Sequence, residues 1–236
     1  MLGGMYSERP AEGLPGAVLW RATPRPGTGP GRVLPDGCMD LILIGDRLVV
    51  AGPDTRAVVT DRSRGERCVG LRFAPGQAPS VLGVPANALV NTRVPLADVW
   101  PSRLVRELTE RVALAERPGA VLTEVALGRL REAEPADDAG WRPAAVAALR
   151  AGRTVAETAH GLGLSERQLH RRSQAAFGYG PKTLTRVLRM GRALAAARGG
   201  VPLARVAAEA GYADQAHLSR EFRALAGVPV SRLLAG

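Results

Sequence analysis

Several residue types are scarce in this chain of 236 residues, and each scarcity excludes a class of protein. The two cysteines, Cys38 and Cys68, are too few for a disulfide framework or for a four-cysteine zinc site. No apolar run approaches the roughly 18 residues of a transmembrane helix, and the N-terminus lacks the basic start and apolar stretch of a secretory signal. We therefore expect a cytoplasmic protein with no membrane partner.

Motifs for catalysis or cofactor binding are also missing. There is no nucleophile elbow, P-loop or dinucleotide fingerprint, and the glycine-rich stretch at Gly27 is not followed by a helix pattern. His160, His170 and His217 do not have the spacing of metal ligands. We therefore predict no enzyme activity, no cofactor and no metal site. Aromatic residues make up 4% of the chain, so its cores must consist mostly of Leu, Val and Ala.

The positive charge is confined to one part of the chain. Residues 1–140 contain 17 basic and 17 acidic residues, whereas residues 141–236 contain 15 basic and five acidic ones. The second part therefore carries the whole net charge of +10. A basic segment joined to a neutral one is typical of a polyanion-binding module attached to a domain of another kind. A basic surface that only confers solubility is the alternative.

The first part of the chain is predicted to be rich in β-structure. Short runs of Val, Ile and Leu are separated by Gly, Pro and Asp, and they predict strands at residues 17–23, 31–35, 38–44, 47–51, 56–60 and 66–73. The break "IGDR" predicts a tight hairpin, and the set favours a small antiparallel barrel or sandwich. Helical turns in "APSVLGVPANALV" and two helices, "SRLVRELTERVALAE" and "GAVLTEVALGRLREA", follow. This α+β domain should cover residues 1–135 and end at the acidic linker "EAEPADDAG".

Residues 141–236 are predicted to be helical throughout, with seven helices. Thr154 with Glu157 has the spacing of a capping box, Ser165 is a suitable N-cap, and Pro181 suits the first turn of a long helix. This arrangement predicts a second, all-α domain.

A unit within this second domain occurs twice. "GLGLSERQLHRR" and "EAGYADQAHLSR" each combine a helix, a glycine-containing turn and a second helix. Val155, Ala159 and Gly163 precede their equivalents by 48 residues, and Leu169 precedes Leu218 by 49. Solenoids usually need three or more repeats, so two helix-turn-helix units are the better interpretation.

Each second helix has a polar face that could read DNA. The polar face carries Arg167, His170, Arg171 and Gln174 in the first unit, and Gln215, Ser219, Arg220 and Arg223 in the second. Such a helix fits the major groove, where Arg pairs with guanine and Gln with adenine. The helix between the units would span about 27 Å at about 1.5 Å per residue, approaching the roughly 34 Å between successive major grooves. Two reading units on one chain could thus contact consecutive grooves.

These residues resemble the AraC family of transcription regulators. The resemblance covers residues 142–236 and rests on "VAETAHGLGLSERQLHRRSQAAFGYGPKTLTRVLRMGRAL" and "LARVAAEAGYADQAHLSREFRALAGV". It implies two helix-turn-helix subdomains joined by a helix, and it places base contacts at Arg167, His170, Arg171, Gln215, Ala216, Ser219 and Arg220. It also places a phosphate contact at Arg186. Two features depart from the family: Ser173 replaces a large apolar residue, and the proline in "GVPVS" is shifted.

The N-terminal part resembles the corresponding region of some AraC-type regulators through "RVLPDGCMDLI", "AGPDTRA" and "GLRFAPG". The resemblance implies a role in sensing a small molecule or in dimerisation. Besides double-stranded DNA, the candidate partners are therefore a small-molecule effector, RNA polymerase and a second copy of the chain. Cys38 and Cys68 are weak candidates for ligand contacts, because a free cysteine is commonly a small buried hydrophobe. Asp36, Asp40 and Asp61 are better explained as turn residues than as acid–base catalysts.

Two other functions compete with that of a sequence-specific regulator. The chain could be an enzyme or small-molecule-binding protein whose helical tail is a scaffold, or a nucleoid protein with no sequence preference. Steep salt dependence of DNA binding favours a DNA-binding protein over the scaffold, and preference among sequences excludes the nucleoid protein.

Overall fold

The structure is a computed structural model that describes residues 4–24, 30–60, 66–133 and 140–235. Its main sheet is antiparallel and has the strand order β1-β2-β7-β4-β5-β8. The strands are β1 (Gly4–Pro10), β2 (Val18–Pro24), β4 (Asp40–Ile44), β5 (Arg47–Ala51), β7 (Cys68–Arg72) and β8 (Arg93–Pro95). A separate two-stranded ribbon pairs β3 (Gly31–Val33) with β6 (Val58–Thr60). The N-terminal part therefore has an antiparallel sheet, as predicted.

The predicted strands are all present, together with two others. The "IGDR" hairpin is confirmed, because Ile44 pairs with Arg47. β1 and β8 were not predicted, and they form the two edges of the sheet. The sheet is open between these edges and does not close into a barrel. The predicted linker lies largely outside the described residues, as does Asp61.

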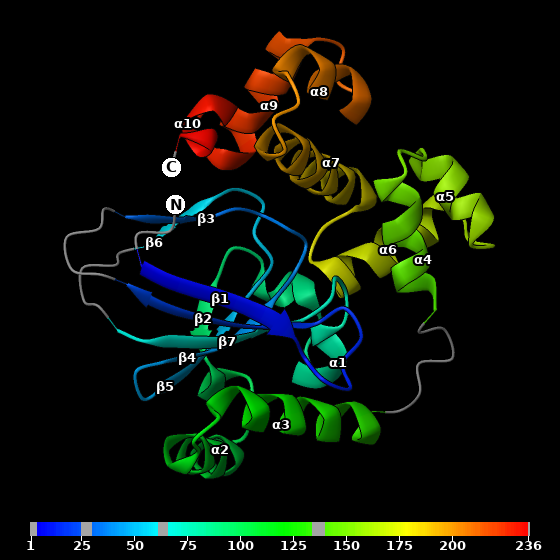
Figure 1. Ribbon diagram of the computed structural model, residues 1–236. Helices are drawn as coiled ribbons and strands as arrows, with labels where there is room; N and C mark the ends of the chain where they lie inside the picture. The colour runs from blue at the N-terminus through cyan, green and yellow to red at the C-terminus, as the bar shows by residue number, and fades with distance from the viewer. Residues whose placement is uncertain (1–3, 25–29, 61–65, 134–139, 236) are drawn as a thin grey trace.

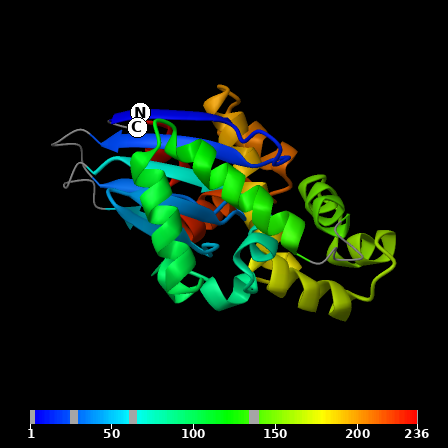
Figure 2. The same cartoon turned by 90° about the horizontal axis from the view of Figure 1, so that it is seen from below.

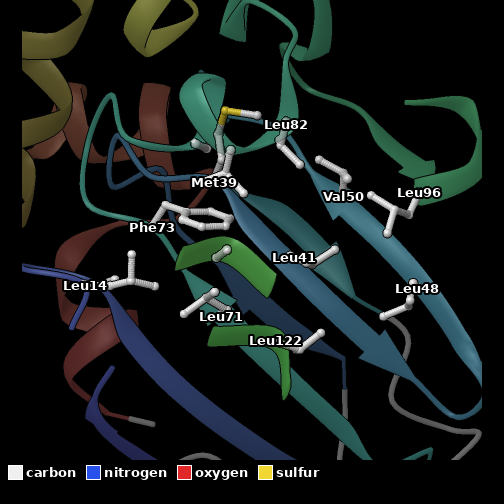
Figure 3. Packing of buried hydrophobic residues seen from close by; sticks show 14 of the residues in the cluster. Leu14, Met39, Leu41, Leu48, Val50, Leu71, Phe73, Leu82, Leu96 and Leu122 are labelled. Carbon is white, nitrogen blue, oxygen red and sulfur yellow. The ribbon is translucent and has the colours of Figure 1, made fainter. Parts of the chain in front are cut away.

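One face of the sheet carries the core of the first domain. Leu19, Leu71, Leu41 and Val50 are direct partners across four adjacent strands and are all buried. Alternation along each strand therefore places one apolar row on this face. Figure 3 shows Phe73, Met39, Leu82 and Leu122 packed around this row.

Helices cover this core face. α1 (Ala78–Leu82), two short 3₁₀ helices, η1 (Ala86–Leu89) and η2 (Leu96–Asp98), and then α2 (Ser102–Leu114) and α3 (Pro118–Glu132) follow the sheet in the chain. Figures 1 and 2 show α2 and α3 on the same side of the sheet, where Leu108, Val112 and Leu122 enter the core. The helical pair predicted for this region is confirmed.

The second domain is helical, with no strand between residues 140 and 235. Its helices are α4 (Trp141–Arg150), α5 (Val155–Gly161), α6 (Glu166–Phe177), α7 (Pro181–Arg198), α8 (Leu203–Ala210), α9 (Gln215–Ala226) and α10 (Val230–Leu234). The Thr154–Glu157 capping box and the Ser165 N-cap are present, and Gly163 and Gly211 both have positive φ. The α+β fold class is therefore confirmed. No helix in the described part of the chain is long and apolar enough to cross a membrane.

α7 connects the two units of this domain and contributes side chains to two separate hydrophobic cores. Leu184, Val187 and Leu188 belong to the core of the first unit, with α4, α5 and α6. Met190, Ala193, Leu194 and Ala197 belong to the core of the second unit, with α8, α9 and α10. Contacts therefore pass from one unit to the other within one turn of α7.

Residues 52–57, which connect β5 to β6, contact both units. Gly178 at the end of α6 lies against Pro53, where an added Cβ would be 2.4 Å from the proline Cγ. The Ala57 N–H donates to the Leu225 carbonyl near the end of α9 at 2.6 Å. Arg32, on β3, donates to the Ala226 carbonyl at 2.9 Å. The C-terminal ends of both α6 and α9 are thus held by the first domain.

The connection at residues 52–57 is itself firmly held. Gly52 donates to the Thr92 carbonyl and Asn91 donates to the Pro53 carbonyl, both at 3.0 Å. The buried Asp54 carboxylate pairs with Arg93, with one contact at 3.0 Å. Hydrogen bonds and an ion pair thus attach this connection to residues 91–93 at several points, which restricts its motion. We call residues 52–57 the bracket.

Candidate nucleic-acid interface

α6 presents a polar face to solvent along most of its length. Arg167, His170, Arg171 and Gln174 lie on this face and are exposed or partly exposed, while Leu169 and Phe177 are buried on the opposite side. The helix begins with a complete capping box, in which the Ser165 hydroxyl accepts from the Gln168 N–H and Gln168 accepts from the Ser165 N–H. The side-chain oxygen of Gln168 is therefore used in the N-terminal cap of α6. The four predicted residues lie together outside the domain core.

α9 presents a corresponding face. Gln215, Arg220 and Arg223 are exposed and Ser219 is partly buried, while Leu218, Phe222 and Leu225 are buried. The Asp214 carboxylate caps the helix by accepting from the His217 N–H. Ala216 is exposed at the start of the helix, where its methyl group can make only an apolar contact.

Arg186 does not lie with either face. Its guanidinium makes two hydrogen bonds to Glu221, from Nε to Oε1 at 2.8 Å and from Nη2 to Oε2 at 3.2 Å. This hydrogen bonding raises the pKa of Arg186, with burial opposing it. The structure thus places Arg186 in an ion pair within the protein, whereas the resemblance implies a phosphate contact there.

The two cysteines do not come together. Cys68 pairs with Ile44 at the C-terminal end of β4, whereas Cys38 lies two residues before the N-terminal end of the same strand. Burial raises the pKa of both thiols, which keeps them protonated and unreactive. Among the described residues no group of His, Cys, Asp and Glu could hold a metal ion.

Cys38 does border a charged cluster on the face of the sheet opposite the core. Arg72 lies 3.4 Å from Asp36 and 3.5 Å from Asp40, and the Trp20 N–H donates to Asp40 at 2.6 Å. Burial raises the pKa of Asp40 to about 6, even though Arg72 and the Trp20 N–H lower it. Tyr179, from the second domain, approaches this cluster with a buried hydroxyl that has no hydrogen-bond partner among the described residues.

Two features of the structure were not predicted from the sequence. The first is that Glu221 lies on the buried face of α9. The one indication in the sequence is that this acidic residue directly precedes the core residue Phe222. Residues 52–57 lie in the motif "AGPDTRA", but nothing in it indicated contact with the second domain, because contacts between domains leave no periodic pattern.

Comparison with known families agrees with this geometry. A family model described as a helix-turn-helix domain matches residues 145–236. A second model, described as a domain of unknown function (DUF6597), matches residues 17–95. No curated protein matches the chain.

The solved structures that resemble this chain include several of ToxT from Vibrio cholerae. One is 12% identical, with 98% of each chain covered and a TM-score of 0.49. ToxT from strain O395 is 10% identical over 100% of this chain and 94% of that chain, with a TM-score of 0.47. ToxT from strain SCE256 with a bound unsaturated fatty acid is 10% identical over 99% and 92%, with a TM-score of 0.45.

The paired units and the matching family model define a protein with a helix-turn-helix DNA-binding domain. Its two units joined by α7 have the arrangement that the resemblance of residues 142–236 to the AraC family implies.

Proposed function

We propose that the protein is a sequence-specific transcription regulator whose α6 and α9 read two consecutive major grooves on one face of the DNA. The observation that carries the proposal is the pair of exposed polar faces, one on each second helix, attached to opposite ends of one rigid helix. Base contacts would come from Arg167, His170, Arg171 and Gln174 on α6, and from Gln215, Ser219, Arg220 and Arg223 on α9.

Charge and helix geometry support this function. The positive excess of the chain lies wholly in residues 141–236, which suits a polyanionic partner. Both reading helices begin with a side-chain cap. Arg167, His170 and Arg171 on α6 and Gln215 and Ser219 on α9 lie in the N-terminal halves of their helices, which is the part of a recognition helix that contacts base edges.

We propose that the first domain modulates this reading. Residues 52–57 contact the end of α6 through Pro53 and the end of α9 through Ala57. A small-molecule effector or a second copy of the chain that shifts this bracket would alter both reading helices together. We therefore assign effector binding and dimerisation to the first domain, and we propose RNA polymerase as a further partner.

The test is selection of bound sequences from a random DNA pool. The wild type should enrich a motif of two half-elements about one helical turn apart. Arg171→Ala combined with Arg220→Ala should lose it. The control is Arg103→Ala combined with Arg106→Ala on α2, which removes the same charge from an exposed site in the first domain.

Each competing function predicts a different result in this selection. A nucleoid protein would bind DNA without enriching a motif. If the helical part were only a scaffold for an enzyme or a small-molecule-binding domain, the protein would not show the steeply salt-dependent DNA binding expected of a DNA-binding protein. Enrichment of a single half-element would mean that only one unit reads bases.

A further inference from the structure

Glu221 is a carboxylate on the apolar face of a reading helix. It lies among Leu218, Phe222 and Leu225, which are fully or nearly fully buried, and is itself only 9% exposed. Glutamate is almost never buried unless it is paired. Its position in the middle of α9 therefore requires a partner that compensates for the lost hydration.

Two arginines of α7 supply that partner. Arg186 binds both carboxylate oxygens, and Arg189, one turn further along α7, brings Nη2 to 3.5 Å from Oε1. Burial alone would raise the pKa of Glu221, but the hydrogen bond from Arg186 and the charges of both arginines outweigh it and hold the pKa below its ordinary value. The carboxylate is therefore ionised at neutral pH.

Arg189 extends the contact to the turn between α8 and α9. Its Nη1 donates to the Gly211 carbonyl at 3.3 Å, and its guanidinium lies 4.4 Å from the centre of the Tyr212 ring. Tyr212 in turn makes an edge contact with His217 on α9, at 5.3 Å between ring centres. Arg186 thus binds α9 alone, whereas Arg189 contacts both α9 and the turn before it.

These contacts lie where α7 passes from one core to the other. Leu188 packs in the core of the first unit and Met190 in that of the second, and Arg186 and Arg189 lie at this point of the helix. A change in the angle between the two units would pivot there. Bidentate ion pairs have strict geometry, so this one constrains an angle that apolar packing alone leaves less defined.

The first unit is held differently. Arg172 is the equivalent of Glu221, 49 residues earlier, and its guanidinium lies 6.0 Å from the Trp141 ring on α4. The following position is Ser173 in the first unit and Phe222 in the second, and both are fully buried. The repeat therefore diverges at the pair of residues that attach the second unit to α7.

We propose that Glu221 is a positioning residue for DNA reading: with Arg186 and Arg189 it fixes α9 at one angle to α7. It thereby sets the direction in which Gln215, Arg220 and Arg223 face the second groove. This inference rests on the proposed function, and it gives Arg186 an internal role in place of the phosphate contact that the resemblance implies.

The experiment compares Glu221→Gln and Arg186→Gln with the wild type in the full chain. Binding is measured on the selected site and on the same site with its second half-element scrambled. Glu221→Gln should weaken binding to the full site by about ten- to a hundredfold, the size expected for one or two lost base contacts. It should leave binding to the scrambled site unchanged, so the effect is confined to α9.

The salt dependence distinguishes an internal role of Arg186 from a phosphate contact. Loss of a phosphate contact reduces the log–log slope of binding against salt by about 0.9, whereas loss of positioning leaves that slope unchanged. A slope reduced in Arg186→Gln, together with wild-type affinity in Glu221→Gln, would overturn the proposal. Wild-type affinity for the full site in a folded Glu221→Gln protein would overturn it as well.

A readout without DNA keeps this test separate from that of the proposed function. Amide hydrogen exchange in α8 and α9 should quicken in Glu221→Gln while exchange in α6 stays unchanged, and unchanged exchange in α9 would refute the positioning role even if the wild type selects no sequence. If Glu221→Gln fails to fold, Arg186→Lys and Arg189→Lys retain the charge but lose the paired hydrogen bonds. They should show the same change confined to α9, and exchange equal to that of the wild type in both would refute the proposal.

Discussion

Single side chains give the two reading helices different capacities. Both polar faces carry two arginines, but α6 adds an exposed histidine, whereas α9 exposes Ala216 near its start and keeps Ser219 partly buried. An alanine cannot hydrogen-bond a base, and a half-buried hydroxyl reaches less far than a guanidinium. The first half-element should therefore be the more strictly specified of the two.

Arg171→Ala and Arg220→Ala test this asymmetry one at a time. Each should weaken specific binding by about 1–3 kcal/mol and relax the base preference only in its own half-element. Titration with DNA carrying single-base changes measures both effects. Arg103→Ala, at an exposed position on α2, is the control and should change neither preference. Relaxation of both half-elements by either variant would contradict independent reading.

Asp40 should give the stability of the protein an unusual pH dependence. Because burial raises its pKa to about 6, the folded state binds more protons than the unfolded state between about pH 4 and 6. Its contribution to stability is therefore fully present below about pH 4 and declines as the pH rises through 6, by about 1–3 kcal/mol.

The comparison that isolates Asp40 is urea unfolding of the wild type and of Asp40→Asn from pH 4 to 7. The difference in unfolding free energy between the two should shift in favour of the variant as the pH rises. Ile42→Val, on the same strand, has no titrating group, and its curve should run parallel to that of the wild type. A parallel curve for Asp40→Asn would contradict the raised pKa.

Among the elements, α6 contains a feature that the repeat makes easy to interpret. Ser173 is fully buried where the second unit has Phe222, and its hydroxyl has no hydrogen-bond partner among the described residues. An unpartnered buried hydroxyl costs about 1–3 kcal/mol. α6 is therefore held less firmly than an apolar residue at this position would allow.

Ser173→Ala should accordingly stabilise the protein by about 1 kcal/mol. Thermal unfolding measures the effect. The matched control is Thr158→Val in the same unit, which removes a buried hydroxyl bonded to the Thr154 carbonyl at 2.8 Å. That variant should destabilise by about 1 kcal/mol, so equal losses in both would show that Ser173 has a hydrogen-bond partner in solution.

Elements with a local signal could be predicted from the sequence. Capping residues, glycine stops and apolar periodicity identified the helices of residues 141–236, and all six predicted strands are present. β1 was missed because a run of exposed residues such as Ser7, Glu8 and Arg9 looks like a polar terminus. β8 was missed because a three-residue edge strand is defined by its partner, β5, and not by its own side chains.

The site could be predicted only in part for the same reason. The polar faces of α6 and α9 follow from helical periodicity, and the structure keeps both faces outside the cores, with Ser219 partly buried. The role of Arg186 depends on Glu221, which is 35 residues away in sequence. No local pattern reports such a pair, so the ion pair could only be found from the fold.

At the scale of the whole molecule, Gly178 connects the reading units to the first domain. Its φ is +85°, and an added Cβ would lie 2.4 Å from Pro53 and 2.9 Å from Val90. Gly152 also has a φ of +85° but has no atom within 4 Å of an added Cβ. The two glycines therefore share a backbone conformation and differ in the contact between the domains.

Comparing Gly178→Ala with Gly152→Ala isolates that contact. Both variants should lose about 1 kcal/mol because of the positive φ, and Gly178→Ala should lose a further 1–3 kcal/mol, roughly, from the clash. Unfolding in urea measures the losses, and amide exchange in residues 52–57 should quicken in Gly178→Ala alone. Equal losses of unfolding free energy in both variants would mean that residues 52–57 shift to accommodate the added methyl group without destabilising the protein.

The division of α7 between two cores also sets the rotational phase of the reading units. Each residue added to a helix turns the remainder of the chain by about 100° and advances it by about 1.5 Å. One residue inserted between Leu188 and Met190 would thus rotate α9 by more than a quarter turn about the axis of α7 while moving it only about 1.5 Å along that axis. The length of α7 between its two cores therefore determines whether both polar faces can contact the same side of the DNA. A change in that length would alter the spacing that the protein requires between the two half-elements before it altered their sequences.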